Sequence, residues 1–201
     1  MPTKTEIELR NRALVAFTIL TGARDGAIAS MKLKHVDLIK GCIQQDAREV
    51  KTKFSKTFTT YFFPIEGDAR KIFDEWVHYL RDKKLRSNND PLFPATQVTL
   101  SHLKQFEVTG LDKNHWSNAT PIRKIFRDAF EKAGLPYFTP HSFRHTLVRL
   151  GEVLCNTPED FKAWSQNLGH EAVLTTFLSY GTVGVHRQGE IIQNLIAKKA
   201  I

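Results

Sequence analysis

Cysteine is scarce in this chain of 201 residues, where only Cys42 and Cys155 occur. Two cysteines are too few for a disulfide framework or a cysteine metal site, and the N-terminus resembles neither a signal peptide nor a membrane-spanning helix. The sequence also lacks a glycine-rich phosphate loop, which argues against ATP use, and a convincing carboxylate cluster, which argues against a metal-dependent nuclease. We therefore expect a protein of a reducing, cytosol-like compartment that needs no cofactor.

The composition indicates one domain and an attraction to polyanions. Hydrophobic residues make up 41% of the chain, which is enough for one well-buried core but not for two full domains. Lysine and arginine number 29 against 21 acidic residues, a formal net charge of +8, and the sequence pI is about 9.5. Such a balance favours nucleic acid as a partner, although a merely basic soluble protein would show the same excess.

The stretch from Thr139 to His145 predicts a helix that carries charge on one face. Thr139 is a typical N-cap and Pro140 a typical first helical residue, so we expect a helix that continues to Leu150. At about 100° per residue, one side of this helix presents His141, Arg144, His145 and Val148, and the other presents Phe143, Leu147 and Leu150. An imidazole and a guanidinium on one rigid support suit the recognition of phosphate oxygens.

A second helix should follow shortly after the first. It begins at Thr157-Pro158-Glu159-Asp160, carries apolar residues at helical spacing up to Leu168, and is ended by Gly169. His170 comes directly after this stop, and Tyr180 lies ten residues further on.

The order His-x-x-Arg-His, then Leu-Gly-His, then tyrosine followed by glycine resembles the C-terminal signature of the tyrosine recombinase (phage-type integrase) family. The resemblance implies an α+β, mainly helical catalytic-domain fold with a small three-stranded antiparallel sheet, which we expect over residues 1–185. Full-length members generally carry a preceding helical core-binding domain, and we expect that domain to be absent from residues 1–201.

The N-terminal region is expected to supply the first active-site arginine. A capping box at Thr5-Glu8 starts a helix that stops at Thr21-Gly22, and a short second helix starts at residue 23. A lone arginine there is usually a solvated surface residue, but the resemblance places the first catalytic arginine of the family at Arg24. Members usually carry an acidic residue three positions later, where this chain has Ala27, and Asp25 is the candidate to orient Arg24 instead.

Three short strands are expected between Gly41 and Pro64, at residues 42–45, 49–53 and 57–63, with Phe54-Ser55 at the second tip. The resemblance places the active-site lysine just before that tip, at Lys53. Lys51 would share its face of the strand and Lys56 lies across the turn, so the assignment among the three stays open. Lysines on such an edge also discourage aggregation, which is the alternative role.

The remaining pattern predicts a core helix over residues 67–85, a loop over residues 86–100, and a helix from Pro121 to Ala133 capped by Thr120. In residues 186–201, apolar residues recur at helical spacing, which predicts a C-terminal helical tail with one apolar face. The resemblance implies that this tail is exchanged between protomers, whereas docking on its own domain is the simpler alternative.

The resemblance assigns one chemical role to each of six residues. Tyr180 would be the nucleophile on phosphorus, Arg24 and Arg144 would hold the non-bridging oxygens, and Lys53 would protonate the leaving 5′-oxygen. His141 would assist proton transfer, and His170 would hydrogen-bond the phosphate. The implied function is site-specific recombination through a 3′-phosphotyrosyl intermediate without metal or ATP.

Two alternatives use the same residues differently. One is DNA relaxation of the type IB topoisomerase kind, and the other is a relic that binds DNA without cutting it. The expected partners are double-stranded DNA and three further copies of the chain in a homotetramer on paired sites, with a monomer possible in isolation and no membrane. We expect a cytoplasmic location in a bacterial or phage-infected host cell.

Overall fold

The computed structural model describes residues 1, 3–102, 104–170, 184–186, 188–190 and 192. Its helices are α1 (Glu6–Thr21), α2 (Asp25–Ser30), α3 (Ala69–His78), α4 (Thr120–Lys132), α5 (Pro140–Leu154) and α6 (Pro158–Asn167). Its strands are β1 (Val36–Asp37), β2 (Cys42–Gln45), β3 (Phe58–Tyr61), β4 (Thr96–Leu100) and β5 (Phe106–Leu111). Short helical turns cover Leu33–His35, Lys53–Ser55 and Tyr79–Lys83. In this described part, no helix is long and apolar enough to cross a membrane.

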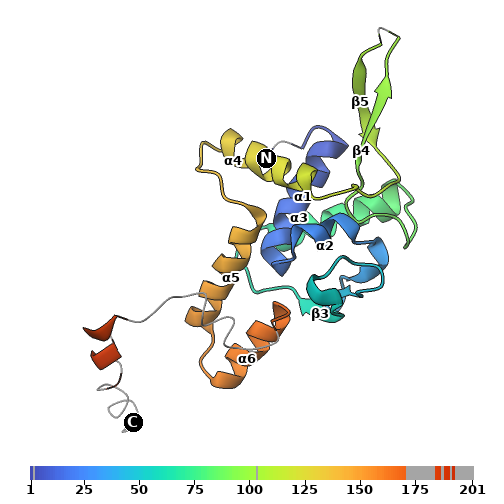
Figure 1. Ribbon diagram of the computed structural model, residues 1–201. Coiled ribbons are helices and arrows are strands. Elements are labelled where there is room, and N and C mark those ends of the chain that lie inside the picture. Colours follow the sequence, from blue (N-terminus) through green and yellow to red (C-terminus); the bar gives the residue numbers. More distant parts are fainter. Residues whose placement is uncertain (2, 103, 171–183, 187, 191, 193–201) are drawn as a thin grey trace.

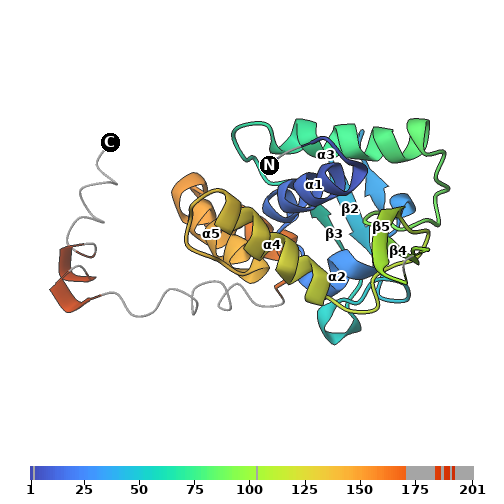
Figure 2. The ribbon, with the colours of Figure 1, turned by 90° about the horizontal axis from the view of Figure 1, so that it is seen from above.

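Helix α1 lies at the centre of the protein and is packed by α3, α5 and β5 (Figures 1 and 2). Its predicted capping box is present, because the Glu8 N–H donates to Thr5 Oγ1 and the Thr5 N–H donates to Glu8 Oε2. Phe17 is fully buried, and its ring lies 5.0 Å from that of Phe73 and 5.3 Å from that of Phe93. The main hydrophobic core therefore forms around this helix.

Gly22 ends α1 as predicted, with a left-handed φ of 59°, and its N–H donates to the Thr18 carbonyl. A Cβ atom at this position would lie 2.9 Å from the Leu147 side chain and 3.0 Å from that of Leu168. Glycine is therefore required both for the turn and for the close approach of α5 and α6.

The three-stranded antiparallel sheet is present, in the order β1-β2-β3, but one predicted strand is wrong. Residues 49–53 are not extended, and the first strand is Val36–Asp37 instead. The reason is a turn at Asp46, whose carbonyl accepts from the N–H groups of Glu49 and Val50 and whose carboxylate accepts from the Arg48 N–H. Lys53 consequently lies in a helical turn between β2 and β3, where strand alternation says nothing about its direction.

The expected loop over residues 86–100 is also wrong in its second half. Strand β4 starts at Thr96 and pairs with β5 in a hairpin that projects from the body of the protein (Figure 1). Four apolar side chains on one face of this hairpin are exposed, namely Val98, Leu100, Phe106 and Val108. Only the base of the hairpin is buried, at Leu111, so most of its apolar residues do not follow the usual inside-outside rule.

Helices α5 and α6 form a smaller core with the sheet. Phe63, Leu147, Val148 and Leu168 are buried there, with Trp164 against them. Burial is not confined to the predicted apolar side of α5, because Val148 and Arg144, on the other side, are 3% and 6% exposed, respectively. The helix predicted at residues 67–85 is present as α3 and the helical turn that follows it. The helix predicted at residues 121–133 is present as α4, which starts at Thr120, and its N-cap is Ala119.

Candidate active site

Arg144 is held inside the protein by two helix ends. Its Nη1 donates to the Gly22 carbonyl at 3.0 Å, and its Nη2 donates to the Leu168 carbonyl. Gly22 is the C-cap of α1 and Leu168 is the C-cap of α6. Burial lowers the pKa of Arg144 to about 9, with a further contribution from Arg24. The guanidinium is thus oriented before any ligand arrives, and its other N–H groups are left to bind one.

Arg24 lies at the N-cap of α2, where the chain turns from α1 into α2. Its side chain is half-buried, and burial lowers its pKa. Across the described ranges of the chain, no hydrogen bond or ion pair engages the Arg24 guanidinium. We expected Asp25 to orient Arg24, but its carboxylate instead accepts from Arg123 at 2.8 Å and from the Gly26 N–H at 2.9 Å. Arg24 is therefore a half-desolvated cation that can gain from an anionic ligand.

A cavity of about 120 Å³ joins three parts of the chain at this point. Arg24 lines it from the α1–α2 junction, Lys53 and Lys56 from the β2–β3 connection, and His170 from the end of α6. The remaining lining residues are Phe54, Phe58 and Gly169. Lys51 is exposed and does not line this cavity, so the geometry favours Lys53 and Lys56 over it.

The two histidines share the same positive surroundings. Burial, together with the charges of Arg144, Arg24, His141 and Lys53, lowers the pKa of His170 to about 4. Desolvation also lowers the pKa of His141, together with His145, Arg144 and Arg24. Both imidazoles are consequently neutral near pH 7 in the free protein. A neutral imidazole beside two guanidiniums can donate a hydrogen bond to an anion or exchange a proton with it.

The structure brings together five of the six expected site residues, Arg24, Lys53, His141, Arg144 and His170. Tyr180, the expected nucleophile, lies outside the described residues. Most of the expected tail over residues 186–201 lies outside them too. Among the described residues, no three His, Cys, Asp or Glu side chains gather as a metal site would require.

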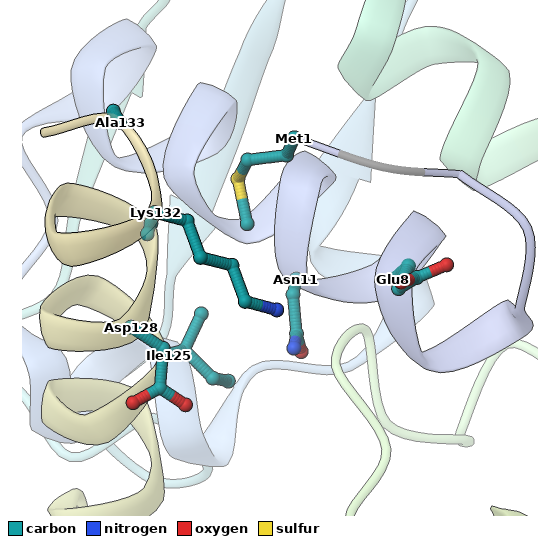
Figure 3. A pocket seen from close by; sticks show the side chains of 8 residues that line it. Met1, Glu8, Asn11, Ile125, Asp128, Lys132 and Ala133 are labelled. Atoms are coloured by element: carbon teal, nitrogen blue, oxygen red, sulfur yellow. The ribbon is translucent and has the colours of Figure 1, made fainter.

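A second cavity, of about 250 Å³, lies between α1 and α4 and has a different character (Figure 3). The Lys132 side chain points from α4 toward Asn11 on α1, and the carboxylates of Glu8 and Asp128 point away from it (Figure 3). Its charges are mixed, and Asp128 is already paired with Lys124. It offers no cluster of cations comparable to that around Arg24.

Sequence reasoning missed the parts of the site that are not charged. The carbonyls of Gly22 and Leu168 orient Arg144, and the rings of Phe54 and Phe58 line the cavity. Phe54 and Ser55 have left-handed φ values of 58° and 49°, which are uncommon for residues other than glycine. The glycines of the Thr-Gly and Leu-Gly-His motifs were the available signal for the two helix ends.

Known proteins are similar to this chain in sequence and in fold. The tyrosine recombinase XerC of Lactobacillus leichmannii is 26% identical over 171 residues, which are 85% of this chain and 50% of that protein. The XerH site-specific recombinase, solved with its difH substrate, matches with a TM-score of 0.56 at 18% identity, over 96% of this chain and 48% of that one. The Tn1549 transposon integrase, solved with transposon end DNA, matches with a TM-score of 0.58 at 13% identity, over 96% of this chain and 61% of that one.

The solved structures confirm the expected α+β, mainly helical catalytic-domain fold. The chain spans about half the length of the curated relatives that it matches. The model of the phage integrase family matches residues 1–184, which include the α1–α2 junction, the β2–β3 connection and the α5–α6 region that build the site. By this match, the chain belongs to the phage integrase family.

Proposed function

We propose that residues 1–185 are the catalytic domain of a tyrosine-type site-specific recombinase that acts on double-stranded DNA. The observation that carries the proposal is the gathering of cations in one place: Arg24, Lys53 and His170 line one cavity, and the charge of Arg144 acts on His170. A DNA phosphate is the anion that suits such a site, and the net charge of +8 suits a polyanion.

In the proposed first step, Tyr180 Oη attacks phosphorus. A Tyr–O–P bond forms, the bond from phosphorus to the 5′-oxygen breaks, and Lys53 gives that oxygen a proton. Arg24 and Arg144 bind the non-bridging oxygens, where charge is greatest in the transition state, and His170 donates a further hydrogen bond. His141 exchanges the proton that the tyrosine loses.

In the second step, a 5′-hydroxyl from another strand attacks the phosphotyrosyl bond and releases Tyr180. One phosphodiester is replaced by another, so no nucleotide needs to be hydrolysed. Because the attacking 5′-hydroxyl comes from a different duplex, the outcome is recombination. Relaxation of supercoils by the same chemistry remains the second candidate, and a two-site recombination assay run beside a relaxation assay separates the two.

The proposal is tested with a nicked DNA substrate from which the short 5′-hydroxyl product is lost after cleavage, so that the enzyme stays attached. In EDTA, we expect a covalent protein–DNA complex that survives denaturation. A failure of the wild-type chain to form this complex on any substrate that it binds would remove the catalytic proposal and leave DNA binding alone.

DNA binding should depend steeply on salt. Each phosphate contact by lysine or arginine releases condensed counterions, so the logarithm of affinity falls linearly with that of salt. Between about 50 mM and about 200 mM salt, we expect at least a tenfold loss of affinity for a non-specific duplex, measured by fluorescence anisotropy. An affinity that does not change over this range would count against DNA as the partner.

The C-terminal tail is proposed to link protomers of a homotetramer. Deletion of residues 187–201 should leave the binding of a single site nearly unchanged, because the cationic cluster is retained, but should weaken cooperative binding and the pairing of two sites. Gel-shift titrations with one-site DNA measure the single-site affinity, and titrations with two-site DNA measure cooperative binding and pairing. Normal pairing and recombination by the truncated chain would assign the tail no such role.

A further inference from the structure

The outer edge of the three-stranded sheet is bound by the side chain of Asn167. Among the residues that the structure describes, β3 is an edge strand, so its outward backbone groups have no neighbouring strand there. The Asn167 carboxamide takes that place: its Oδ1 accepts from the Tyr61 N–H at 2.7 Å, and its Nδ2 donates to the Tyr61 carbonyl at 2.9 Å. This pair of bonds is the one that a residue of a paired strand would make.

The backbone of Asn167 is held as well. Its carbonyl accepts from the Thr60 hydroxyl at 2.9 Å, and that hydroxyl accepts from Gln45 Nε2 at 3.0 Å. Thr60 and Gln45 are 1% and 4% exposed, so these bonds lie away from water, where an unpaired polar group is costly. Strands β2 and β3 therefore fix the last residue of α6 from both its side chain and its main chain.

The three residues that follow Asn167 all belong to the site. The Leu168 carbonyl accepts from Arg144, and His170 lines the cavity with Arg24 and Lys53. Gly169, between them, lies against the Phe58 ring at the start of β3, where an added Cβ atom would approach ring carbons to 2.6 Å. A shift of Asn167 along β3 would therefore move the acceptor of Arg144 and the imidazole together, relative to the segment that carries Lys53.

We propose that Asn167, together with Thr60, is a positioning residue. It holds the Leu168 carbonyl, which binds Arg144, and the His170 imidazole at a fixed distance from the β2–β3 connection that carries Lys53. The inference rests on the proposed cleavage of DNA. Neither residue touches the substrate, so the expected loss lies in the rate constant of covalent attachment at saturating DNA and not in affinity.

The sharpest variant is Asn167→Asp, which keeps the size and shape of the side chain but replaces the Nδ2 donor by an oxygen. Its matched control is Gln166→Glu, the same amide-to-carboxylate change at the neighbouring residue, whose side chain is exposed. At neutral pH we expect Asn167→Asp to lower the single-turnover rate constant on the order of 10-fold or more, and Gln166→Glu to leave it near wild type. A merely structural role would instead lower the reacting fraction and leave the rate constant of that fraction unchanged.

The pH dependence gives a second readout. The introduced carboxyl cannot donate to the Tyr61 carbonyl while ionised, but it can when protonated. As the pH falls from about 7 toward about 4, where an aspartate carboxyl ordinarily takes up its proton, we therefore expect the rate constant of Asn167→Asp, divided by that of Gln166→Glu, to rise toward one. A flat ratio would contradict the proposed role of the donor.

Thr60 tests the proposal from the sheet side if Asn167→Asp fails to fold. Thr60→Val removes the hydroxyl with little change of volume, and Thr60→Ser retains it. We expect the first variant to react slowly and the second at nearly the wild-type rate. If the wild-type chain forms the covalent complex but Asn167→Asp and Thr60→Val do so equally fast, the positioning role is wrong and the proposed function stands. If the wild-type chain forms none, the proposed function itself fails.

Discussion

Tyr180→Phe should abolish covalent attachment to DNA and leave the fold and the affinity for DNA nearly unchanged. The substitution removes one phenolic oxygen, which is the atom proposed to attack phosphorus, and leaves the rest of the side chain in place. The measurement is the yield of denaturation-resistant complex on the nicked substrate, with affinity measured in parallel by anisotropy.

Tyr137→Phe is the matched control, since it removes the same oxygen from a tyrosine whose ring packs against Phe130, outside the cationic cavity. It should react at the wild-type rate. Attachment of Tyr180→Phe at the wild-type level would end the assignment of the nucleophile.

The second large effect is expected at Arg144. Arg144→Lys should lower the rate of attachment by about 10²- to 10³-fold, because a lysine offers a single point charge where the guanidinium presents several oriented donors to the developing charge. A single ammonium cannot reproduce the geometry in which the Gly22 and Leu168 carbonyls both accept from one planar group. A carbonyl left without its donor also costs roughly 1–3 kcal/mol of folding free energy.

The control for this prediction is Arg149→Lys, on the same helix but at an exposed position. Chemical denaturation separates the two consequences at Arg144, since a loss of stability lowers the folded fraction while a loss of transition-state contacts lowers the rate of the folded protein. A rate for Arg144→Lys within a fewfold of wild type would show that the guanidinium is not in contact with the phosphate.

Much of the helical frame was predictable because its signals are local. The capping boxes at Thr5 and Thr157 both form, Pro140 starts α5, and glycines follow the ends of α1 and α6. Side-chain caps and left-handed glycines act within one helical turn, so they leave a trace in a short stretch of sequence. The candidate site residues came from the family resemblance, whose motifs place Arg24, Arg144 and His170 at or near the ends of these helices.

The errors have tertiary causes. Residues 49–53 carry strand-forming residues, but the turn at Asp46 ends the extended run, and the Glu49 side chain contacts Lys34 and His35 from a distant segment. The β4–β5 hairpin exposes the apolar residues that normally identify a buried face. Arg144 lies deep in the protein because two carbonyls from distant segments bind it, and a helical wheel cannot anticipate such partners. The role inferred for Asn167 likewise depends on a contact with Tyr61, more than a hundred positions away in sequence.

The central claim, that this chain joins itself to DNA through one tyrosine, is tested most directly by locating the attachment. The covalent complex is formed in EDTA, digested with trypsin and nuclease, and analysed by mass spectrometry. Cleavage after Lys162 and Arg187 yields a peptide of residues 163–187, in which Tyr180 is the sole tyrosine among several serines and threonines. The account predicts a nucleotide phosphate on this peptide, with fragmentation that places it on Tyr180. Attachment through another residue, or cleavage that requires a divalent metal and leaves no adduct, would contradict it.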